Sequence, residues 1–330
     1  MQIFVNDPDF IVEDMLKGFT AAHPEVALST LNERVVTIKD KKKKVGVITG
    51  GGSGHEPAFL GYVGEGMLDA VAIGEIFASP PAQVFLDAMI EADNGHGVAC
   101  LFGNYAGDNM NVKMAIQMAE DEDIEVKYVV ATDDIASSPK ETREKRHGIA
   151  GGYFMWKVGG AKAAAGGTLD EVIATAQKVV DRTRSVCVGV NPCTIPAVGT
   201  PNFMIDPETM EFGIGHHGET GIEKKALGSA KEIAIEMTEA ILTDFEFDES
   251  KKLAVMISGL GSTMLMEQYV ICGQVLETLK EKGHQVEKVY VGNFVTSLDM
   301  GGISLTIVDL DEEIIELLEA EGQATGLKNY

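Results

Sequence analysis

The stretch TGGGSGHEPAF at residues 49–59 marks the end of a predicted strand and the start of a glycine-rich loop. The residues leading into it, Val45–Thr49, form a short apolar run rich in β-branched side chains, which is typical of a buried strand. Glycines directly after such a run predict that the chain leaves the sheet there. We therefore expect a loop that begins at Gly50 and carries polar side chains at the carboxyl end of this strand.

Glycine-rich loops after strands often bind phosphate, but this one lacks the residues that the common phosphate loops use. A P-loop requires a lysine after its last glycine, and here His55 follows Gly54. The dinucleotide pattern G-x-G-x-x-G fails because Pro57 and Phe59 stand in the wrong places. Two interpretations remain open on these residues alone. The backbone N–H groups of Gly50–Gly54 could bind an anion or another ligand, or the glycines could allow a strand and a helix to pack closely.

Apolar runs alternate with amphipathic stretches through the first half of the chain. Further strands are predicted at Gly97–Phe102 and Glu125–Ala131, and helices at Ala82–Ala92 and Met110–Glu120. This alternation predicts an α/β fold with a mainly parallel or mixed sheet flanked by helices. Ligands of such sheets bind at the carboxyl ends of the strands, so we expect the site in the loops at 50–57, 103–109 and 132–135.

The second half begins with a helix at Leu169–Thr183 and a new strand at Ser185–Val190. The elements predicted after it are strands at Met210–Gly215, Leu253–Leu260, Val286–Val291 and Ile303–Val308, and helices at Ala230–Leu242, before Glu281 and at Asp311–Glu321. We predict two α/β domains, residues 1–183 with the glycine-rich loop and residues 184–330.

The charge of the chain argues against some classes of partner. The 51 acidic residues outnumber the 27 basic ones and give a net charge of −24, which repels nucleic acid and anionic lipid. No window of 18 apolar residues predicts a transmembrane helix, and the N-terminus lacks the features of a signal peptide. The four cysteines form no C-x-x-C pair, so we expect neither a zinc site nor a disulfide framework. Isolated thiols suit a reducing compartment, and we expect the cytoplasm.

Three positions carry candidate chemistry. His55 lies in a predicted loop at a strand end, where an imidazole can act as a general base near neutral pH. Asp108 lies just before a predicted helix, and from spacing alone we expect it to be an N-cap. His216 and His217 are adjacent, so from a strand only one of them can face a site, and we expect the other at the surface. A neutral imidazole is also a nucleophile that can add to a carbonyl carbon, whereas further ligands at metal-binding spacing are missing.

Several blocks of the sequence, in order, resemble the ketose-binding K subunit of the dihydroxyacetone kinase family. The first is Thr49–Pro57 itself, followed by Gly61-Tyr-Val-Gly64. The others are Asn6-Asp-Pro8, His23-Pro24, Asn104-Tyr105, Gly107-Asp108, Met110-Asn111, Asp133-Asp134, Gly148-Ile-Ala-Gly151, Gly213–Glu219 and Thr296–Met300. The resemblance covers nearly the whole chain and rests on no single block.

The resemblance implies a homodimer of two-domain chains that bind a short ketose between the domains. It implies that His217 holds the ketone as a covalent hemiaminal, that His55 is a general base and that Asp108 is its partner. It also implies that Gly52, Ser53 and Gly54 line the substrate. The nucleotide loop of the family, Asp-Gly-Asp-Thr-Gly, is not found in this sequence. We therefore expect no cofactor on this chain, and ATP or ADP with Mg²⁺ on a separate nucleotide-binding L-type subunit.

Some positions depart from the dihydroxyacetone pattern. Gly103 replaces a lysine that is usual before Asn-Tyr, Phe59 stands where a histidine is common, and Asn109 where an aliphatic residue is common. The stretch 135–147 resembles homologues linked to four-carbon ketoses such as erythrulose. A four-carbon ketose is therefore an alternative substrate. A second alternative is a ketose sensor that activates a transcription factor, since such paralogues can keep the covalent histidine.

Overall fold

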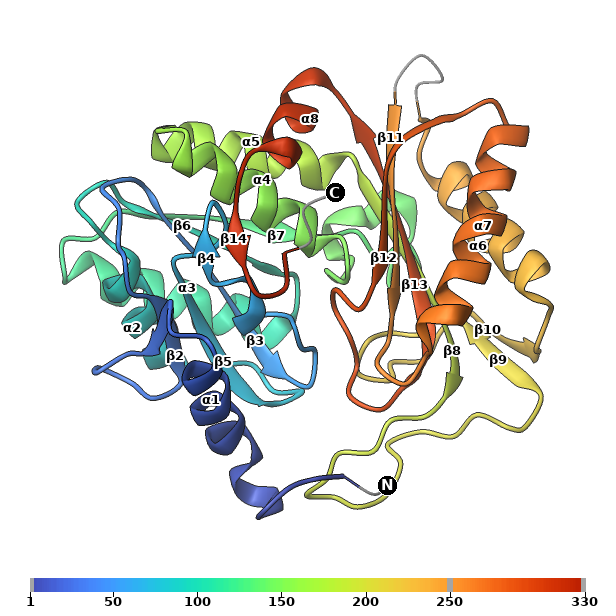
Figure 1. The fold of residues 1–330 in the computed structure, drawn as a ribbon, viewed down its shortest axis with the longest axis horizontal. Helices are drawn as coiled ribbons and strands as arrows, with labels where there is room; N and C mark the ends of the chain where they lie inside the picture. The colour runs from blue at the N-terminus through green and yellow to red at the C-terminus, as the bar shows by residue number, and fades with distance from the viewer. Residues whose placement is uncertain (1–2, 248–251, 328–330) are drawn as a thin grey trace. The chain divides into compact units, whose positions relative to one another are not determined.

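Two six-stranded sheets organise the chain, one in each of two compact units (Figure 1). The computed structural model describes residues 3–247 and 252–327. Unit 1 comprises residues up to Ala131, Gly152–Val180 and the residues from Glu316 on, and unit 2 comprises Thr132–Gly151 and Asp181–Ile315. Across the described ranges, every helix is too short or too polar to cross a lipid bilayer.

The sheet of unit 1 has the order β1-β2-β5-β3-β6-β7. Its strands are β1 (Val26–Leu28), β2 (Val35–Ile38), β3 (Gly46–Ser53), β5 (Ala70–Ile76), β6 (Val98–Gly103) and β7 (Val126–Ala131). Strands β5, β3, β6 and β7 are parallel, whereas β1 and β2 add an antiparallel edge. The helices are α1 (Ile11–Ala22), α2 (Ala82–Ala92), α3 (Ala106–Glu120), α4 (Gly152–Ala164) and α5 (Leu169–Asp181). Short elements complete the unit: η1 (Pro8–Phe10), η2 (Leu60–Tyr62), β4 (Gly64–Glu65) and β14 (Gln323–Ala324).

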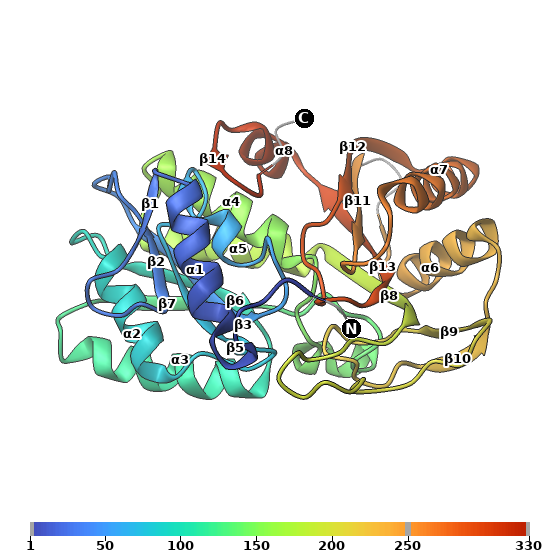
Figure 2. The ribbon, with the colours of Figure 1, turned by 60° about the horizontal axis from the view of Figure 1, so that its bottom comes forward.

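Alternation along the strands places apolar side chains on both faces of this sheet. On β2, Val35 packs in the core under α2 and α3, whereas its neighbour Val36 packs in the core under α1. On β5, Ala72 packs in the core under α2 and α3, and its neighbour Val71 packs in the core under α1. Helices α2 and α3 contact each other over the first of these faces (Figure 2). The sheet is thus buried on both sides, as the predicted α/β fold requires.

The sheet of unit 2 is mixed, with the order β10-β9-β8-β13-β11-β12. Its strands are β8 (Thr183–Asn191), β9 (Thr209–Phe212), β10 (Glu223–Ala226), β11 (Lys252–Gly259), β12 (Gln285–Gly292) and β13 (Gly301–Leu310). Its helices are η3 (Lys140–Lys145), α6 (Ala230–Asp244) and α7 (Leu265–Glu281), and α8 (Glu312–Glu319) leads from unit 2 into unit 1. Helices α6 and α7 pack side by side on one face, as Figure 1 shows, and cover inward side chains such as Val255 and Leu305.

The division into units differs from the single boundary that we predicted after residue 183. Residues 132–151 pack with unit 2 and the residues from Glu316 on pack with unit 1, so the chain passes between the units more than once. Gly326, for example, donates its backbone N–H to Gly61 O at 2.7 Å. Hydrophobic periodicity predicts the type of an element but not the sheet that it joins, which explains the difference.

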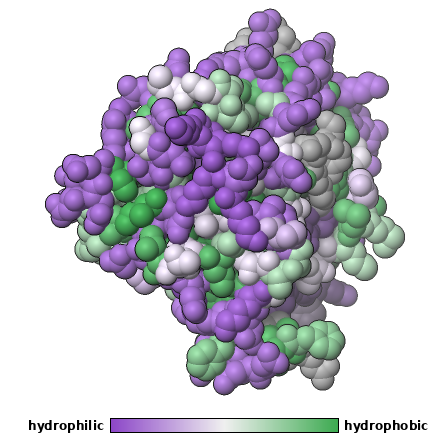
Figure 3. All heavy atoms as spheres, turned by 60° about the vertical axis from the view of Figure 1, so that its left-hand side comes forward, coloured by the Kyte–Doolittle hydropathy of each residue, from purple (hydrophilic) through white to green (hydrophobic). Residues whose placement is uncertain are grey.

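Side chains on one surface of the molecule are mainly hydrophilic, with apolar groups scattered in small clusters (Figure 3). This surface agrees with the content of charged residues, which make up 24% of the sequence. Scattered apolar side chains of this kind are normal for a water-exposed surface.

Candidate functional site

Gly50, Gly51 and Gly52 of the opening stretch lie within strand β3, which continues to Ser53. Our prediction that the loop begins at Gly50 was therefore wrong. A Cβ on Gly50 would lie 2.4 Å from the ring of Phe85, and one on Gly51 would lie 2.2 Å from the ring of Phe59. A Cβ on Gly52 would lie 2.7 Å from a backbone nitrogen, that of Ala78. These approaches are shorter than side chains tolerate, so close packing is the reason that the strand uses glycine here.

The loop that follows β3 is fixed by polar contacts of its own. Ser53 donates its hydroxyl to Gly74 O at 2.8 Å, and Gly54, with φ +97°, donates its N–H to the Glu56 carboxylate at 3.0 Å. Burial raises the pKa of that carboxyl. Backbone in this left-handed region favours glycine, which accounts for Gly54. The loop is thus held in one shape before any ligand arrives.

His55 and Asp108 are both buried in unit 1, with exposed fractions of 4% and 7%. The His55 ring lies against Phe77, with 5.1 Å between ring centroids. Asp108 lies in the first turn of α3, whose N-cap is Tyr105, so the predicted capping role of Asp108 was wrong. Strands β3 and β6 are parallel neighbours, and the loops that follow them leave the sheet at the same edge. An imidazole and a carboxylate therefore follow adjacent strand ends, where ligands of α/β sheets bind.

His216 and His217 lie in a tight turn of unit 2, not on the strand that we predicted to reach Gly215. Strand β9 ends at Phe212, and Gly218, with φ +81°, donates its N–H to Gly215 O at 3.1 Å. His216 is 2% exposed, so our expectation that one of the two histidines lies at the surface was wrong. Burial is the main cause that lowers the pKa of His216 to about 3, and the charge of His217 adds to the effect. His216 is therefore neutral at physiological pH.

Glu219 binds His217 through both of its carboxylate oxygens. Oε1 lies 2.7 Å from Nδ1 of the His217 ring, and Oε2 accepts the backbone N–H of His217 at 2.9 Å. Burial alone would raise the pKa of the Glu219 carboxyl, but the hydrogen bond and charge of His217 outweigh it and lower that pKa to about 2. A Cβ on Gly215 would lie 2.1 Å from Glu219 Oε2, so the position must be glycine for this carboxylate to fit.

The contact with Glu219 decides which nitrogen of His217 is reactive. An ionised carboxylate can only accept a hydrogen bond, so Nδ1 carries the proton in the neutral tautomer, which is the form that can act as a nucleophile. The lone pair then lies on Nε2. About a quarter of the His217 side chain, 26%, is exposed. The arrangement therefore orients Nε2 as a partly exposed nitrogen that can act as a nucleophile when the ring is neutral.

Other polar groups of unit 2 lie near this turn, and sequence reasoning did not single them out as site residues. Asp134 is 2% exposed, and burial raises the pKa of its carboxyl to about 7. His147 lies within electrostatic range of His217 and Glu219, and burial lowers its pKa. The sequence offered one indication of their importance, because Asp134 and His147 follow the third predicted strand, at whose carboxyl end we expected ligands to bind. Over the described residues, no three His, Cys, Asp or Glu side chains are arranged to hold a metal ion.

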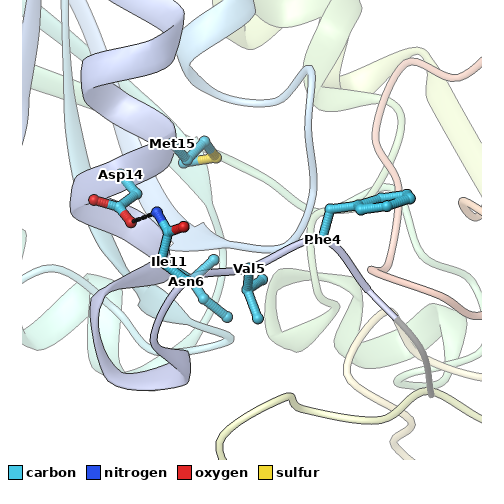
Figure 4. A pocket seen from close by; sticks show the side chains of 6 residues that line it. All are labelled: Phe4, Val5, Asn6, Ile11, Asp14 and Met15. Carbon is cyan, nitrogen blue, oxygen red and sulfur yellow. Dashed lines mark hydrogen bonds between the residues drawn. The ribbon is translucent and has the colours of Figure 1, made fainter.

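A hollow of about 480 Å³ lies at the N-terminal segment of unit 1 (Figure 4). The side chains that line it are Phe4, Val5, Asn6, Ile11, Asp14 and Met15. Asn6 donates to the Asp14 carboxylate at 2.7 Å, which ties the segment to α1, and Asp7 caps η1. The Asn6-Asp7-Pro8 block of the sequence is thus explained by local structure.

Comparison with known proteins gives consistent matches over almost the whole chain. A family model described as the Dak1 domain matches residues 17–326. The dihydroxyacetone-binding subunit of a PTS-dependent dihydroxyacetone kinase from Listeria innocua is 40% identical over 314 residues, which are 95% of each chain. An L-erythrulose 1-kinase from Mycolicibacterium smegmatis is 37% identical over 324 residues, which are 97% of this chain and 57% of that protein.

A solved structure described as a dihydroxyacetone kinase operon co-activator, DhaQ, has the same fold. Its TM-score is 0.89 at 33% identity, and the match covers 95% of this chain and 97% of that one. The predicted α/β architecture and the resemblance drawn from the sequence blocks are both confirmed. The chain belongs to the Dak1 domain family of dihydroxyacetone kinases.

Proposed function

We propose that this chain is the substrate-binding subunit of a dihydroxyacetone-type kinase and binds a short ketose covalently on His217. The observation that supports this most directly is the 2.7 Å contact between Glu219 Oε1 and His217 Nδ1, because a proton held on Nδ1 places the lone pair of the neutral ring on Nε2, the nitrogen that would attack a carbonyl. The 40% identity to a dihydroxyacetone-binding subunit supports the choice of substrate class.

The proposed covalent step is an addition without a leaving group. Nε2 of His217 forms a bond to C2 of the ketose while the π bond of the carbonyl breaks. Glu219 accepts the Nδ1 proton of the ring and passes it through solvent to the former carbonyl oxygen, so the carboxylate is regenerated and the product is a neutral hemiaminal. The bond holds the substrate in one orientation and lowers the entropic cost of the later transfer. Glycerol has no carbonyl group and is excluded by the same chemistry.

We assign the handling of the hydroxyl proton to His55 and Asp108, with Gly52, Ser53 and Gly54 lining the substrate. Both side chains are buried, and a buried base near neutral pH suits removal of a proton from an attacking hydroxyl. A separate nucleotide-binding L-type subunit, carrying ATP or ADP with Mg²⁺, would supply the phosphate. The L. innocua relative is named PTS-dependent, which favours a phosphotransferase system as the ultimate donor.

Two alternatives follow from specific observations. The erythrulose kinase relative and the small Gly103 at the end of β6 favour a four-carbon ketose as the substrate. The co-activator structure at 33% identity favours a ketose sensor that performs no transfer. Four buried free thiols agree with a reducing compartment, and we propose the cytoplasm.

We propose that the chain forms a homodimer through the exposed start of α7. Five large apolar side chains are exposed there, Met264, Leu265, Met266, Tyr269 and Val270, and a hollow of about 320 Å³ adjoins them. Glu267 is the one charged residue among positions 264–270, although the chain carries a net charge of −24. Two copies with such a charge can approach closely where the charge is sparse. Val270→Glu should convert the dimer to a monomer in light scattering, and an unchanged mass would refute this surface.

One experiment separates the proposed function from its alternatives. The purified chain is exposed to dihydroxyacetone, erythrulose and glycerol and measured by native mass spectrometry, and turnover is then assayed with an L-type subunit and a phosphate source. We expect a mass increase of one ketose, no increase with glycerol, and formation of ketose phosphate. Binding without turnover supports the sensor, and absence of any ketose adduct refutes the proposal.

A further inference from the structure

Another histidine of unit 2, His147, lies in residues 132–151, and part of this segment packs beside the His217 turn. Residues 133–135 run along the start of β8, with Ile135 donating to Ser185 O at 3.0 Å and Ser185 donating to Asp133 O at 2.8 Å. The next residue, Ala136, packs against Gly213 so closely that a Cβ on the glycine would lie 2.7 Å from the Ala136 Cβ. The segment is therefore in direct contact with the base of the turn that carries His217.

The backbone of His147 is fixed to this segment from both sides. Its N–H donates to Ser137 Oγ at 2.9 Å, and its carbonyl accepts the N–H of Asp134 at 3.1 Å. The preceding residue, Arg146, is 1% exposed and makes two hydrogen bonds to Asp244, of 2.8 and 2.6 Å. These contacts anchor the main chain of His147 before a ligand binds, which is the condition for a precise substrate contact.

The electrostatic surroundings of the His147 ring are those of the His217 site. Burial lowers its pKa, the charge of Glu219 raises it and the charge of His217 lowers it again. The net lowering keeps the ring neutral at physiological pH. A neutral imidazole has one N–H donor and one acceptor nitrogen, so it can bind a hydroxyl group in either sense.

The other polar side chains considered near the turn either bind neighbouring groups or are more deeply buried than His147. Both carboxylate oxygens of Glu219 bind His217. The Asp134 carboxylate is buried and accepts the N–H of Ala136 at 3.0 Å. His216 is 2% exposed, whereas His147 is only partly buried. Of these groups, His147 is partly exposed and has a ring that can both donate and accept a hydrogen bond.

We propose that His147 is a further ketose-contacting residue, which hydrogen-bonds a hydroxyl of the polyhydroxy ketone attached to His217. The proposal rests on the function proposed above. It identifies the ligand as a ketone with a hydroxyl group on each side of the carbonyl, because one hydroxyl is needed for phosphoryl transfer and His147 binds another. His147 thereby selects for polyhydroxy ketones over ketones with a single hydroxyl.

The test compares dihydroxyacetone with hydroxyacetone, which lacks one of the two hydroxyls. The fraction of adduct is titrated against each ketone by native mass spectrometry, in the wild type and in His147→Ala. A single hydrogen bond of about 1 kcal/mol predicts that dihydroxyacetone binds roughly fivefold more tightly than hydroxyacetone in the wild type. His147→Ala should remove most of this ratio by weakening dihydroxyacetone alone.

Two further variants distinguish a direct contact between His147 and the ketose from an effect of the substitution on the local fold. Ser137→Ala removes one hydrogen bond to the His147 main chain and leaves the ring, so it should lower the ratio less than His147→Ala does. His147→Gln keeps an amide donor and acceptor and should retain part of the ratio. If His147→Ala leaves the ratio unchanged, or weakens both ketones equally, the proposal is refuted. If neither ketone forms an adduct with the wild type, the proposed hemiaminal function has failed instead.

Discussion

Glu219→Gln is the substitution that most directly tests how the turn activates His217. The carboxylate lies 2.7 Å from Nδ1 and 2.9 Å from the backbone nitrogen of the same residue. Glutamine has almost the same shape and can still occupy this space. The substitution replaces a carboxylate, which can only accept hydrogen bonds, with an amide, which can accept or donate them. With the amide in place, Nδ1 of His217 no longer has to carry the ring proton.

The magnitude follows from the loss of charge in one hydrogen bond. A hydrogen bond to a charged group contributes about 1.5–3 kcal/mol and a neutral one about 0.5–1.5 kcal/mol. Because 38% of the Glu219 side chain is exposed, solvent screens the interaction and the lower end of the difference applies. A loss of about 1 kcal/mol corresponds to roughly fivefold weaker ketose adduct formation.

The assay is a titration of adduct fraction against dihydroxyacetone by native mass spectrometry. Glu223→Gln is the matched control, because Glu223 lies at the exposed start of β10 and loses the same charge. The control should bind as the wild type does. If Glu219→Gln also binds as the wild type does, the carboxylate does not set the protonation of His217 and our account of the nucleophile is incorrect.

Three further predictions concern other parts of the molecule. Arg146→Ala should destabilise the fold by about 1.5–3 kcal/mol in urea denaturation, because Asp244 loses its bidentate partner but keeps the hydrogen bond from Arg184 Nε at 3.0 Å, and a loss below 1 kcal/mol would contradict this. Asp134→Asn should raise the melting temperature relative to the wild type by an amount that grows from about pH 4 to pH 7 and is then constant. Its pKa rises from 3.8 to about 7 on folding, so the folded chain holds a proton that the unfolded chain releases, and a pH-independent difference would count against the shift. Asp108→Asn should keep ketose binding within about twofold and slow phosphate transfer by about 10²–10⁴-fold, and unimpaired transfer would remove Asp108 from catalysis.

The sequence predicted the elements of the fold well where the hydrophobic pattern was strong. Helix α2 was predicted with its observed bounds, Ala82–Ala92, and the strands from Val45 and Leu253 were found within a few residues. Helix α4 was missed because its residues, Gly152–Ala164, are rich in glycine and buried almost all round, so they show no amphipathic pattern. Strand β5 was missed for a related reason, since Ala70–Ile76 is buried on both faces and does not alternate.

The candidate site was only partly predictable. His217 and Glu219 were found as a polar cluster, but their mutual hydrogen bonds depend on a turn that glycines at 215 and 218 make possible. The glycines of β3 were taken for a loop because the sequence does not reveal the rings of Phe59 and Phe85 that approach them. His147 could not be placed near His217 from sequence, since about 70 residues separate them and a tertiary contact joins their segments.

The central claim is that Nε2 of His217 bonds to the carbonyl carbon of a ketose. A crystal structure of the chain soaked in dihydroxyacetone tests it most directly, with His217→Ala as the comparison. The account predicts continuous density from Nε2 to a tetrahedral C2 in the wild type and none in the variant. Ketose held at Nδ1, bonded to another residue, or bound without a covalent link would contradict it.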